Sequence, residues 1–159
     1  VFITGDFSLT PGETGWIIKK PIGVYTMDSW KEQEMPFYSW GVTYSKEFSI
    51  EKADGSWQVA LQKWAGTIAE VSVNGKAATP VAFPPYVSDV TGLIKPGMNK
   101  IEVKVIGSLR NLLGPHHSKP NPGFVTPWTW RNIDTYPPGK EYNFLDYGLF
   151  EEFILLKSE

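Results

Sequence analysis

Apolar and polar residues alternate along several short segments of this chain, most clearly in two of them. Residues 68–73 read Ile-Ala-Glu-Val-Ser-Val and residues 100–105 read Lys-Ile-Glu-Val-Lys-Val, so every second side chain is apolar. This period of two is typical of strands with one buried face. Asn74-Gly75 follows the first segment and Pro96-Gly97 precedes the second, and both pairs are typical of tight turns. The pattern predicts an antiparallel sheet with one apolar and one polar face.

Further short strands are expected from similar patterns elsewhere in the chain. A first strand is expected to be anchored by Phe2, Phe7 and Leu9, and others are expected at residues 16–18, 42–50 and 57–61, with a closing apolar strand within residues 145–156. No segment keeps a helical period of 3.6 residues, although residues 88–94 are expected to form a short helical turn. Many short strands separated by Gly and Pro turns predict an all-β fold, an antiparallel β-sandwich of two sheets.

Length and charge narrow the classes of protein that fit. At 159 residues the chain has the length of one domain, so residues 1–159 are expected to form a single β-sandwich domain. A net charge of −2 gives no reason to expect nucleic acid or an anionic membrane as a partner. The sequence contains no cysteine, no signal peptide and no apolar run of about 18 residues, so membrane insertion is not expected. Because it begins with Val1 rather than Met, we expect an excised module or a processed product.

Motifs in the middle of the chain resemble those of one known domain type. Residues 69–76 (Ala-Glu-Val-Ser-Val-Asn-Gly-Lys), the Asp-Val-Thr segment at 89–91 and the Leu-Ile-Lys-Pro-Gly segment that opens residues 93–105 follow one another in a recognisable order. This order resembles the sugar-binding jelly-roll domain of family 2-type glycoside hydrolases, which belongs to the galactose-binding-like β-sandwich group. The resemblance covers most of the chain from Trp30 onward and is specific for the domain type rather than for a substrate.

The flanking segments extend this resemblance. Residues 30–39, which include Trp-Lys-Glu-Gln and Pro-Phe-Tyr-Ser, are similar to the opening segment of these domains, although Glu34 and Trp40 stand where glycine is expected. Residues 111–117 and 146–150 are similar to rhamnosidase-like members of the group. The resemblance implies a galactose-binding-like jelly roll that acts as a non-catalytic accessory module of a bacterial glycoside hydrolase in polysaccharide degradation. It also implies a periplasmic or extracellular location, with the catalytic acids on a separate domain.

Residues 107–140 form a segment in which the alternation fails and Pro and Gly accumulate. A loop of this length inside a domain is usually functional or packed against something. It contains every Arg and every His of the chain. Indole rings can stack on the C–H face of a pyranose, while Arg, Asn and His can hydrogen-bond to its hydroxyl groups. The candidate carbohydrate-binding residues are therefore Arg110, Asn111, His116, His117, Trp128, Trp130 and Arg131. The alternative is a structural lid, with its tryptophans packed inward and its arginines bound to backbone carbonyls.

Neither a metal site nor a catalytic site is expected from the remaining polar residues. His116 and His117 are adjacent, so on an extended chain their rings point to opposite sides and suit one tetrahedral ion poorly. No Asp-rich loop is present, and the resemblance alone leaves a calcium ion open; no other cofactor is expected. Asp89 and Asp146 are expected to be the most buried carboxylates, Asp89 fixing a turn and Asp146 binding backbone N–H groups or Arg131. No catalytic residue is assigned.

Two functions from different classes remain open on the sequence. In the first, the module binds carbohydrate through residues 107–140. In the second, it is a purely structural domain that packs against the catalytic domain of the same polypeptide. Four other tryptophans are expected in the core or at its margins rather than in a site: Trp30, Trp40, Trp57 and Trp64.

Overall fold

The computed structural model describes residues 3–117, 126–130 and 137–158, with backbone only for residues 129 and 130. The chain divides into two units, each with its own internal contacts. The sandwich unit comprises Met27–Ser29, Trp40–Ser108 and Tyr147–Glu159. The loop unit comprises Val1–Thr26, Trp30–Ser39 and Leu109–Asp146. The expectation of a single domain over residues 1–159 stays a prediction.

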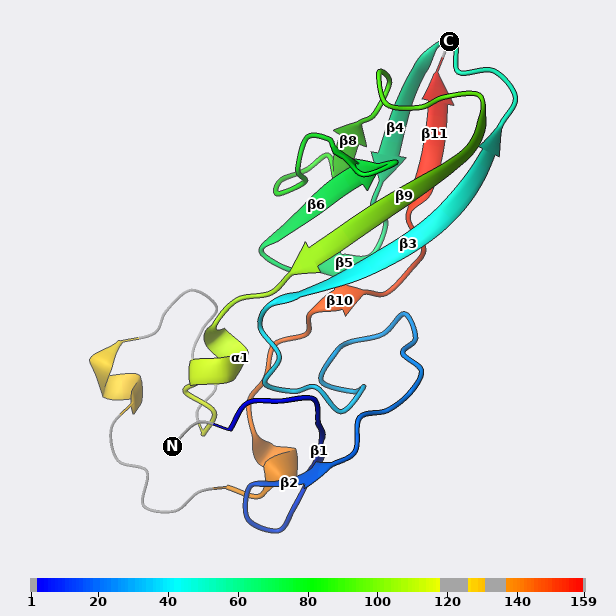
Figure 1. Ribbon diagram of the computed structural model, residues 1–159. Coiled ribbons are helices and arrows are strands. Elements are labelled where there is room, and N and C mark those ends of the chain that lie inside the picture. The colour runs from blue at the N-terminus through cyan, green and yellow to red at the C-terminus, as the bar shows by residue number, and fades with distance from the viewer. Residues whose placement is uncertain (1–2, 118–125, 131–136, 159) are drawn as a thin grey trace. The chain divides into compact units, whose positions relative to one another are not determined.

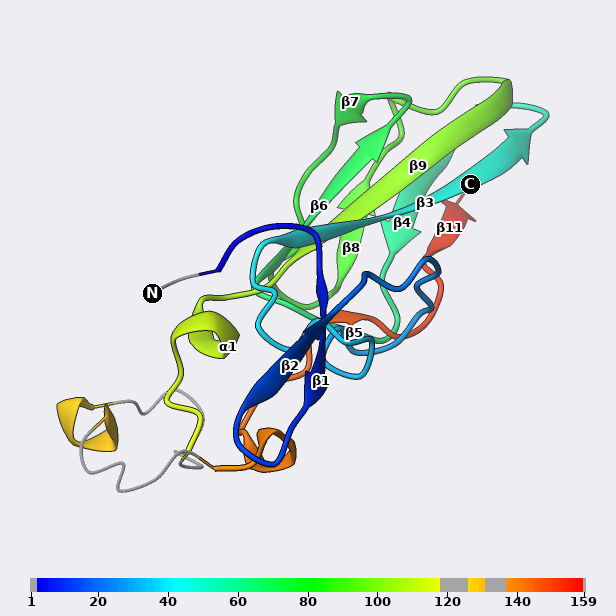
Figure 2. The ribbon, with the colours of Figure 1, turned by 60° about the horizontal axis from the view of Figure 1, so that its bottom comes forward.

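The strands of the sandwich unit pair only in antiparallel fashion among the described residues. Its larger sheet has the order β3-β9-β6-β7, with strands Gly41–Ile50, Gly97–Ile106, Ile68–Val73 and Lys76–Ala77. A second sheet has the order β11-β4-β8, with strands Ile154–Ser158, Ser56–Ala60 and Val87–Asp89, and a short pair joins β10 (Gly148–Leu149) to β5 (Trp64–Ala65). Figures 1 and 2 show the two main sheets as two layers, which confirms the predicted antiparallel β-sandwich.

The core of the sandwich unit lies between these layers and is built by the alternation seen in the sequence. On β9 and β6 every second side chain is buried, and the cross-strand register places Val71 opposite Val103 and Ala69 opposite Val105. Trp57 and Val59 on β4 supply buried side chains from the other sheet. Each fully buried Val or Ile side chain contributes roughly 1.5–3 kcal/mol relative to an exposed one. The predicted inner face is therefore confirmed.

Two turns of the sandwich unit follow from residue type. Asn74 and Gly75 have φ values of 52° and 78° and join β6 to β7, as the Asn-Gly pair predicts. The Asp89 carboxylate accepts hydrogen bonds from the Thr91 hydroxyl at 2.6 Å and from the Thr91 N–H at 2.9 Å, and these bonds lower the pKa of Asp89. The expected turn role of Asp89 is confirmed.

The helical turn expected over residues 88–94 is only partly present. This segment begins within β8, which ends at Asp89, and the turn follows, with the Leu93 N–H donating to the Val90 carbonyl at 2.9 Å. The closing apolar segment likewise contains two strands, β10 and β11, rather than one. Both differences arise because neighbouring strands, which the local pattern does not reveal, decide where a ladder begins and ends.

Asn99 is a buried polar residue on β9 that fixes the loop preceding the strand. Its side-chain oxygen accepts hydrogen bonds from Asn74 Nδ2 and from the Lys95 N–H, both at 3.0 Å. Its side-chain nitrogen donates to the carbonyls of Lys95 at 2.7 Å and Gly97 at 3.1 Å. One amide therefore ties the Lys95–Gly97 turn to the Asn74-Gly75 turn.

The loop unit has little regular structure. Strands β1 (Ser8–Pro11) and β2 (Trp16–Lys19) form a hairpin, and three short helices follow later in the chain. These are α1 (Arg110–Leu113) and the 3-10 helices η1 (Pro127–Trp130) and η2 (Gly139–Glu141). Gly139 packs so closely on the hairpin turn that a Cβ atom there would lie 2.4 Å from the Gly15 carbonyl oxygen.

A cluster of half-buried aromatic rings packs together in the loop unit. Its ring centroids lie 4.9–6.1 Å apart, mostly in edge-to-face arrangements. The members are Trp16, Phe37, His116, Tyr142 and Phe144. Nearby in the sequence, Glu34 has a φ of 60°, a conformation that favours glycine. This backbone conformation agrees with the expectation, from the sequence resemblance, of a glycine at position 34.

Asn99→Ala should lower the free energy of unfolding by about 3 kcal/mol, because it removes four hydrogen bonds and leaves buried backbone groups without their partner. Urea unfolding of the purified chain measures the change. The exposed neighbour Lys100 provides the control, since Lys100→Ala should change stability by no more than about 0.5 kcal/mol. Equal effects of the two substitutions would contradict the role assigned to Asn99.

Candidate functional site

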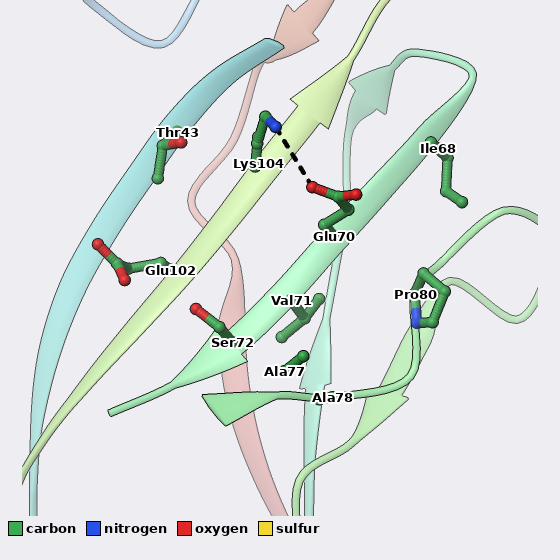
Figure 3. A pocket seen from close by; sticks show the side chains of 10 residues that line it. All are labelled: Thr43, Ile68, Glu70, Val71, Ser72, Ala77, Ala78, Pro80, Glu102 and Lys104. Atoms are coloured by element: carbon green, nitrogen blue, oxygen red, sulfur yellow. Dashed lines mark ion pairs between the residues drawn. The ribbon is translucent and has the colours of Figure 1, made fainter. Parts of the chain in front are cut away.

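A shallow hollow of about 580 Å³ lies on the outer face of the larger sheet of the sandwich unit (Figure 3). Its floor is formed by outward residues of β3, β9 and β6. One wall is the segment from Ala77 to Pro80, which runs along the edge of β6 opposite β9. It is held there by the Ala78 N–H···Val71 O and Val81 N–H···Ala69 O hydrogen bonds, both 2.8 Å. The complete lining is Thr43, Ile68, Glu70, Val71, Ser72, Ala77, Ala78, Pro80, Glu102 and Lys104.

Three charged side chains converge on this hollow because of the strand register. Glu70 on β6 lies directly across from Lys104 on β9, and their side chains form an ion pair at 3.4 Å (Figure 3). Glu102, two residues before Lys104 on the same face, pairs with Lys100 at 2.7 Å. Two carboxylates and one ammonium therefore share the lining with the hydroxyl groups of Thr43 and Ser72. Sequence reasoning treated these residues only as the polar side of a sheet.

Trp40 lies next to this face, and its expected place in the core or at its margin is wrong. It is 72% exposed, and the Lys104 Nζ sits 5.7 Å from the centroid of its ring. Trp40 precedes β3, whose first paired residue is Gly41, so the indole falls at the end of the ladder and beyond the inner face. The other three tryptophans agree with expectation, since Trp30 and Trp57 are buried and Trp64 is half-buried.

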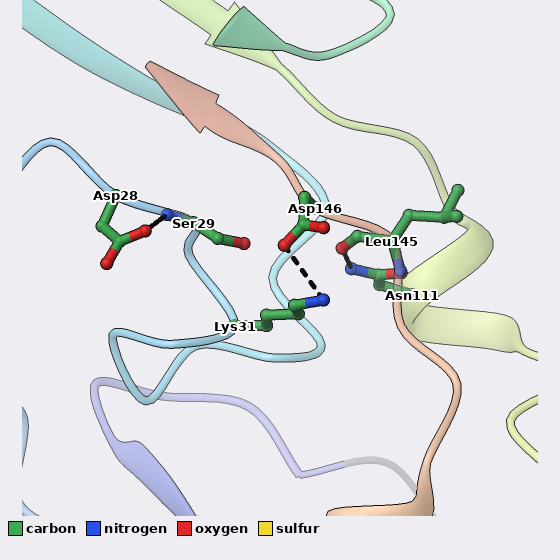
Figure 4. Close-up of polar contacts among 6 residues, drawn as sticks. All are labelled: Asp28, Ser29, Lys31, Asn111, Leu145 and Asp146. Carbon is green, nitrogen blue, oxygen red and sulfur yellow. Dashed lines mark hydrogen bonds and ion pairs between the residues drawn. The ribbon is translucent and has the colours of Figure 1, made fainter. Parts of the chain in front are cut away.

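Among the predicted site residues, Asn111 has a structural role, because both polar atoms of its side chain bond to the backbone of Leu145. It is buried, its Nδ2 donates to the Leu145 carbonyl at 2.9 Å, and its Oδ1 accepts from the Leu145 N–H at 2.9 Å (Figure 4). Within the sandwich unit, the hydroxyl groups of Ser108 and Tyr147 lie 2.5 Å apart. In both units, hydrogen bonds therefore join a residue near position 110 to a residue near position 146.

His116 is held inside the aromatic cluster of the loop unit. Its ring stacks on Tyr142 with centroids 5.3 Å apart, and its Nε2–H donates to the Asn111 carbonyl at 2.8 Å. Burial is the main cause that lowers the pKa of His116, opposed by this hydrogen bond and assisted by the nearby charges of Arg110 and His117. The structure therefore brings Asn111 and His116 together, in a packing arrangement.

The other predicted site residues are placed differently. Arg110 on α1 and His117 are half-buried, and Trp128 on η1 is 73% exposed. The side chain of Trp130 and the whole of Arg131 lie outside the described residues. A carbohydrate-binding role for these residues stays a prediction.

The carboxylates expected to be buried are in fact exposed. Asp89 and Asp146 both lie at the surface of their units. Asp146 forms an ion pair with Lys31 at 2.9 Å (Figure 4), a partner more than a hundred residues away in sequence. Asp89 bonds to Thr91 and Asp146 pairs with Lys31, so both exposed carboxylates have a structural partner.

Within the described residues, no group of three or more His, Asp or Glu side chains is arranged to hold a metal ion. Calcium binding, which the resemblance left open, stays untested. No helix in the described part of the chain is both long and apolar enough to span a membrane.

Comparison with known proteins shows similarity at the level of fold. No family model matches the chain, and no curated protein matches it. A rhamnosidase from Novosphingobium sp. PP1Y superposes with a TM-score of 0.59 and 21% identity, over 98% of this chain and 15% of that chain. A β-glucuronidase from Ruminococcus gnavus has a TM-score of 0.44 and 20% identity over 53% of this chain and 16% of that chain. A β-D-glucuronidase from Dictyoglomus thermophilum has a TM-score of 0.41 and 22% identity over 65% and 19%.

These similar structures are all glycoside hydrolases, and the chain spans only 15–19% of the length of each. At these identities the likeness to the rhamnosidase shows a shared fold. It extends over both the sandwich unit and the loop unit, because nearly the whole chain is covered.

Acidification should destabilise the chain through His116. Its folded-state pKa lies below the unfolded value of 6.5, so the unfolded chain binds the proton first as pH falls. Stabilisation present above pH 6.5 is therefore lost as pH drops from 6.5 toward the folded-state pKa. Urea unfolding at about pH 7.5 and about pH 5.5 measures this loss.

His116→Phe should flatten this pH dependence, because it keeps an aromatic ring in the cluster and removes the titrating group. His117→Gln is the matched control and should retain most of the dependence, since the burial of His116 is unchanged. An equal pH dependence in His116→Phe and the unmodified chain would contradict this assignment.

Proposed function

We propose that this chain is a non-catalytic, galactose-binding-like jelly-roll module of a larger bacterial glycoside hydrolase, with the catalytic carboxylates elsewhere in the polypeptide. The rhamnosidase match supports this, because 98% of the chain superposes on 15% of a glycoside hydrolase. The motifs shared with sugar-binding jelly-roll domains point in the same direction. A periplasmic or extracellular location follows from the same proposal.

The main role that we assign to the module is packing against the catalytic domain of its own polypeptide. The observation that carries this role is an apolar stripe at α1, formed by Leu109, Leu112 and Leu113, which are 59%, 40% and 48% exposed. Their spacing of three and four residues places them on one side of the helical turn. Contiguous exposed apolar side chains of this kind mark interaction surfaces in soluble proteins.

The occupant of this stripe is a covalently attached domain rather than a diffusing partner. The structurally similar rhamnosidase has more than four-fifths of its length outside the matched region, so the parent polypeptide supplies ample surface. A short stripe alone suits a contact within one polypeptide, because attachment removes most of the entropic cost of association. Within the loop unit, α1 is joined to the aromatic cluster by the hydrogen bond from His116 Nε2–H to the Asn111 carbonyl at 2.8 Å.

The double substitution Leu112→Ser and Leu113→Ser should leave the free energy of unfolding of the 159-residue chain within about 1 kcal/mol, because both side chains are exposed. In the full parent polypeptide it should accelerate limited proteolysis at the module and lower its melting temperature. Ile17→Ser with Ile18→Ser on β2 is the matched control, since these side chains are also exposed and apolar in the same unit. Equal protease sensitivity of the double variant and the unmodified parent would overturn the packing role.

Carbohydrate binding through residues 107–140 is a second candidate, favoured by the exposure of Trp128, which at 73% leaves much of the indole open to a sugar ring. Isothermal titration of the chain with a panel of neutral and acidic oligosaccharides tests it. Trp128→Ala should weaken any such binding by about tenfold, as expected from the loss of roughly 1–2 kcal/mol of stacking. Tyr25→Ala, which removes another exposed aromatic ring of the loop unit, should leave affinity unchanged. Unchanged affinity in Trp128→Ala would place any site elsewhere.

A further inference from the structure

The hollow on the outer face of the β3-β9-β6-β7 sheet has the size and the mixed lining of a small-molecule site. Its volume of about 580 Å³ gives room for one or two sugar rings lying against the sheet, with one side open to solvent. Ile68, Ala78 and Pro80 give it an apolar side. Thr43, Ser72 and the charged residues supply hydrogen-bonding groups on the other side (Figure 3). Apolar and polar surfaces therefore meet in one depression.

This combination matches a polyhydroxylated ring. A pyranose has C–H groups that pack on apolar surface and hydroxyl groups that both donate and accept hydrogen bonds. The carboxylates of Glu70 and Glu102 accept from hydroxyl groups, and the ammonium of Lys104 donates to them. Hydrogen bonds to charged groups are shorter and stronger than neutral ones, so each of these contacts orients a sugar firmly.

The charges at the hollow balance, which suits a neutral sugar better than an acidic one. Glu70 is paired with Lys104 at 3.4 Å, and Glu102 is paired with Lys100 at 2.7 Å. The carboxylate of a uronic acid would have to compete with Glu70 or Glu102 for an ammonium group that is already paired. A neutral hydroxyl group can instead insert into the loose Glu70–Lys104 pair, accepting from Nζ and donating to the carboxylate.

The position of Lys104 is fixed by its surroundings on the sheet. The aliphatic part of the Lys104 side chain passes over Gly41, and a Cβ atom at position 41 would lie 2.7 Å from Lys104 Cε. Its Nζ lies 5.7 Å from the ring centroid of Trp40 while also pairing with Glu70. A side chain at position 41 would therefore push the end of Lys104 away from its present place on the face.

We propose that this hollow binds a neutral pyranoside, with Glu70, Glu102 and Lys104 as the hydrogen-bonding residues and with Gly41 as a positioning residue for Lys104. The proposal rests on the proposed function only in assuming that the parent protein handles carbohydrate. It concerns a surface separate from residues 107–140, to which the candidate sugar-binding residues of the sequence belong.

Amide chemical-shift mapping of the ¹⁵N-labelled 159-residue chain tests the proposal directly. The probes are methyl glycosides of neutral hexoses, methyl α-L-rhamnopyranoside, cellotetraose and xylotetraose, with methyl β-D-glucuronide as the acidic comparison. At least one neutral probe should shift the amides of Thr43, Ser72 and Lys104 and the indole N–H of Trp40. At equal concentration, the glucuronide should produce chemical-shift changes at least tenfold smaller at the same groups.

Variants identify the groups responsible. Glu102→Ala should lower the affinity for the neutral probe by about tenfold, as expected for a lost hydrogen bond to a charged group. Gly41→Ala should lower this affinity severalfold, because the added Cβ displaces Lys104. Glu47→Ala is the matched control, since Glu47 lies exposed on the same sheet but outside the lining, and it should change affinity less than twofold. Circular dichroism of each variant confirms that the fold is retained.

Each outcome separates this proposal from the proposed function. Shifts confined to the Trp128 indole and its neighbours would overturn the hollow and support the loop as the sugar site. Shifts at the sheet that Glu102→Ala leaves unchanged would overturn the assigned residues. Absence of shifts with every probe would overturn sugar binding at the hollow, while the packing role would still be decided by the leucine variants in the parent polypeptide.

Discussion

Burial of one face of β9 is the constraint on which the sandwich unit depends. Ile101, Val103 and Val105 are fully buried, and the strand pairs with β3 on one edge and β6 on the other. Since side chains alternate along a strand, burial of these residues forces Glu102 and Lys104 outward. The same register brings Glu70 opposite Lys104. The polar chemistry of the outer face is therefore a geometric consequence of the apolar core.

The loop unit meets a different constraint, because several of its aliphatic side chains, among them Ile17, Val24 and Leu109, are exposed rather than buried. Aromatic rings pack together instead in mostly edge-to-face contact, and the neutral form of His116 serves as one of these rings. Asn111 and His116, two of the residues predicted to bind sugar, thus act as hydrogen-bonding and packing groups in this unit. What remains available on this unit is a set of exposed apolar side chains, a composition that suits contact with protein surface better than contact with water.

Local patterns predicted the parts of the structure that local physics decides. Alternation located β3, β4, β6 and β9, and Asn74-Gly75 located a turn, because strand faces and positive φ values depend on neighbouring residues alone. The predictions for Trp40 and Asp146 were wrong because the surroundings of these residues are set by parts of the chain that are distant in sequence. The indole lies beyond the end of a ladder, and the carboxylate pairs with Lys31 from a distant segment. The hollow could not be predicted from the sequence either, since it requires the register of three strands together with the course of residues 77–80.

The hydrogen bonds of Asn111 with Leu145, and of Ser108 with Tyr147, have a consequence for how this fold can change over evolution. In each unit they join positions that flank the segment between residues 111 and 145, so its two ends are held close together independently of what lies between. The entropy of closing a loop grows only slowly with its length. Insertions and deletions between these positions therefore leave the sandwich largely undisturbed. Changes in the length of this segment can thus be accommodated while the strands of the sandwich unit keep their register.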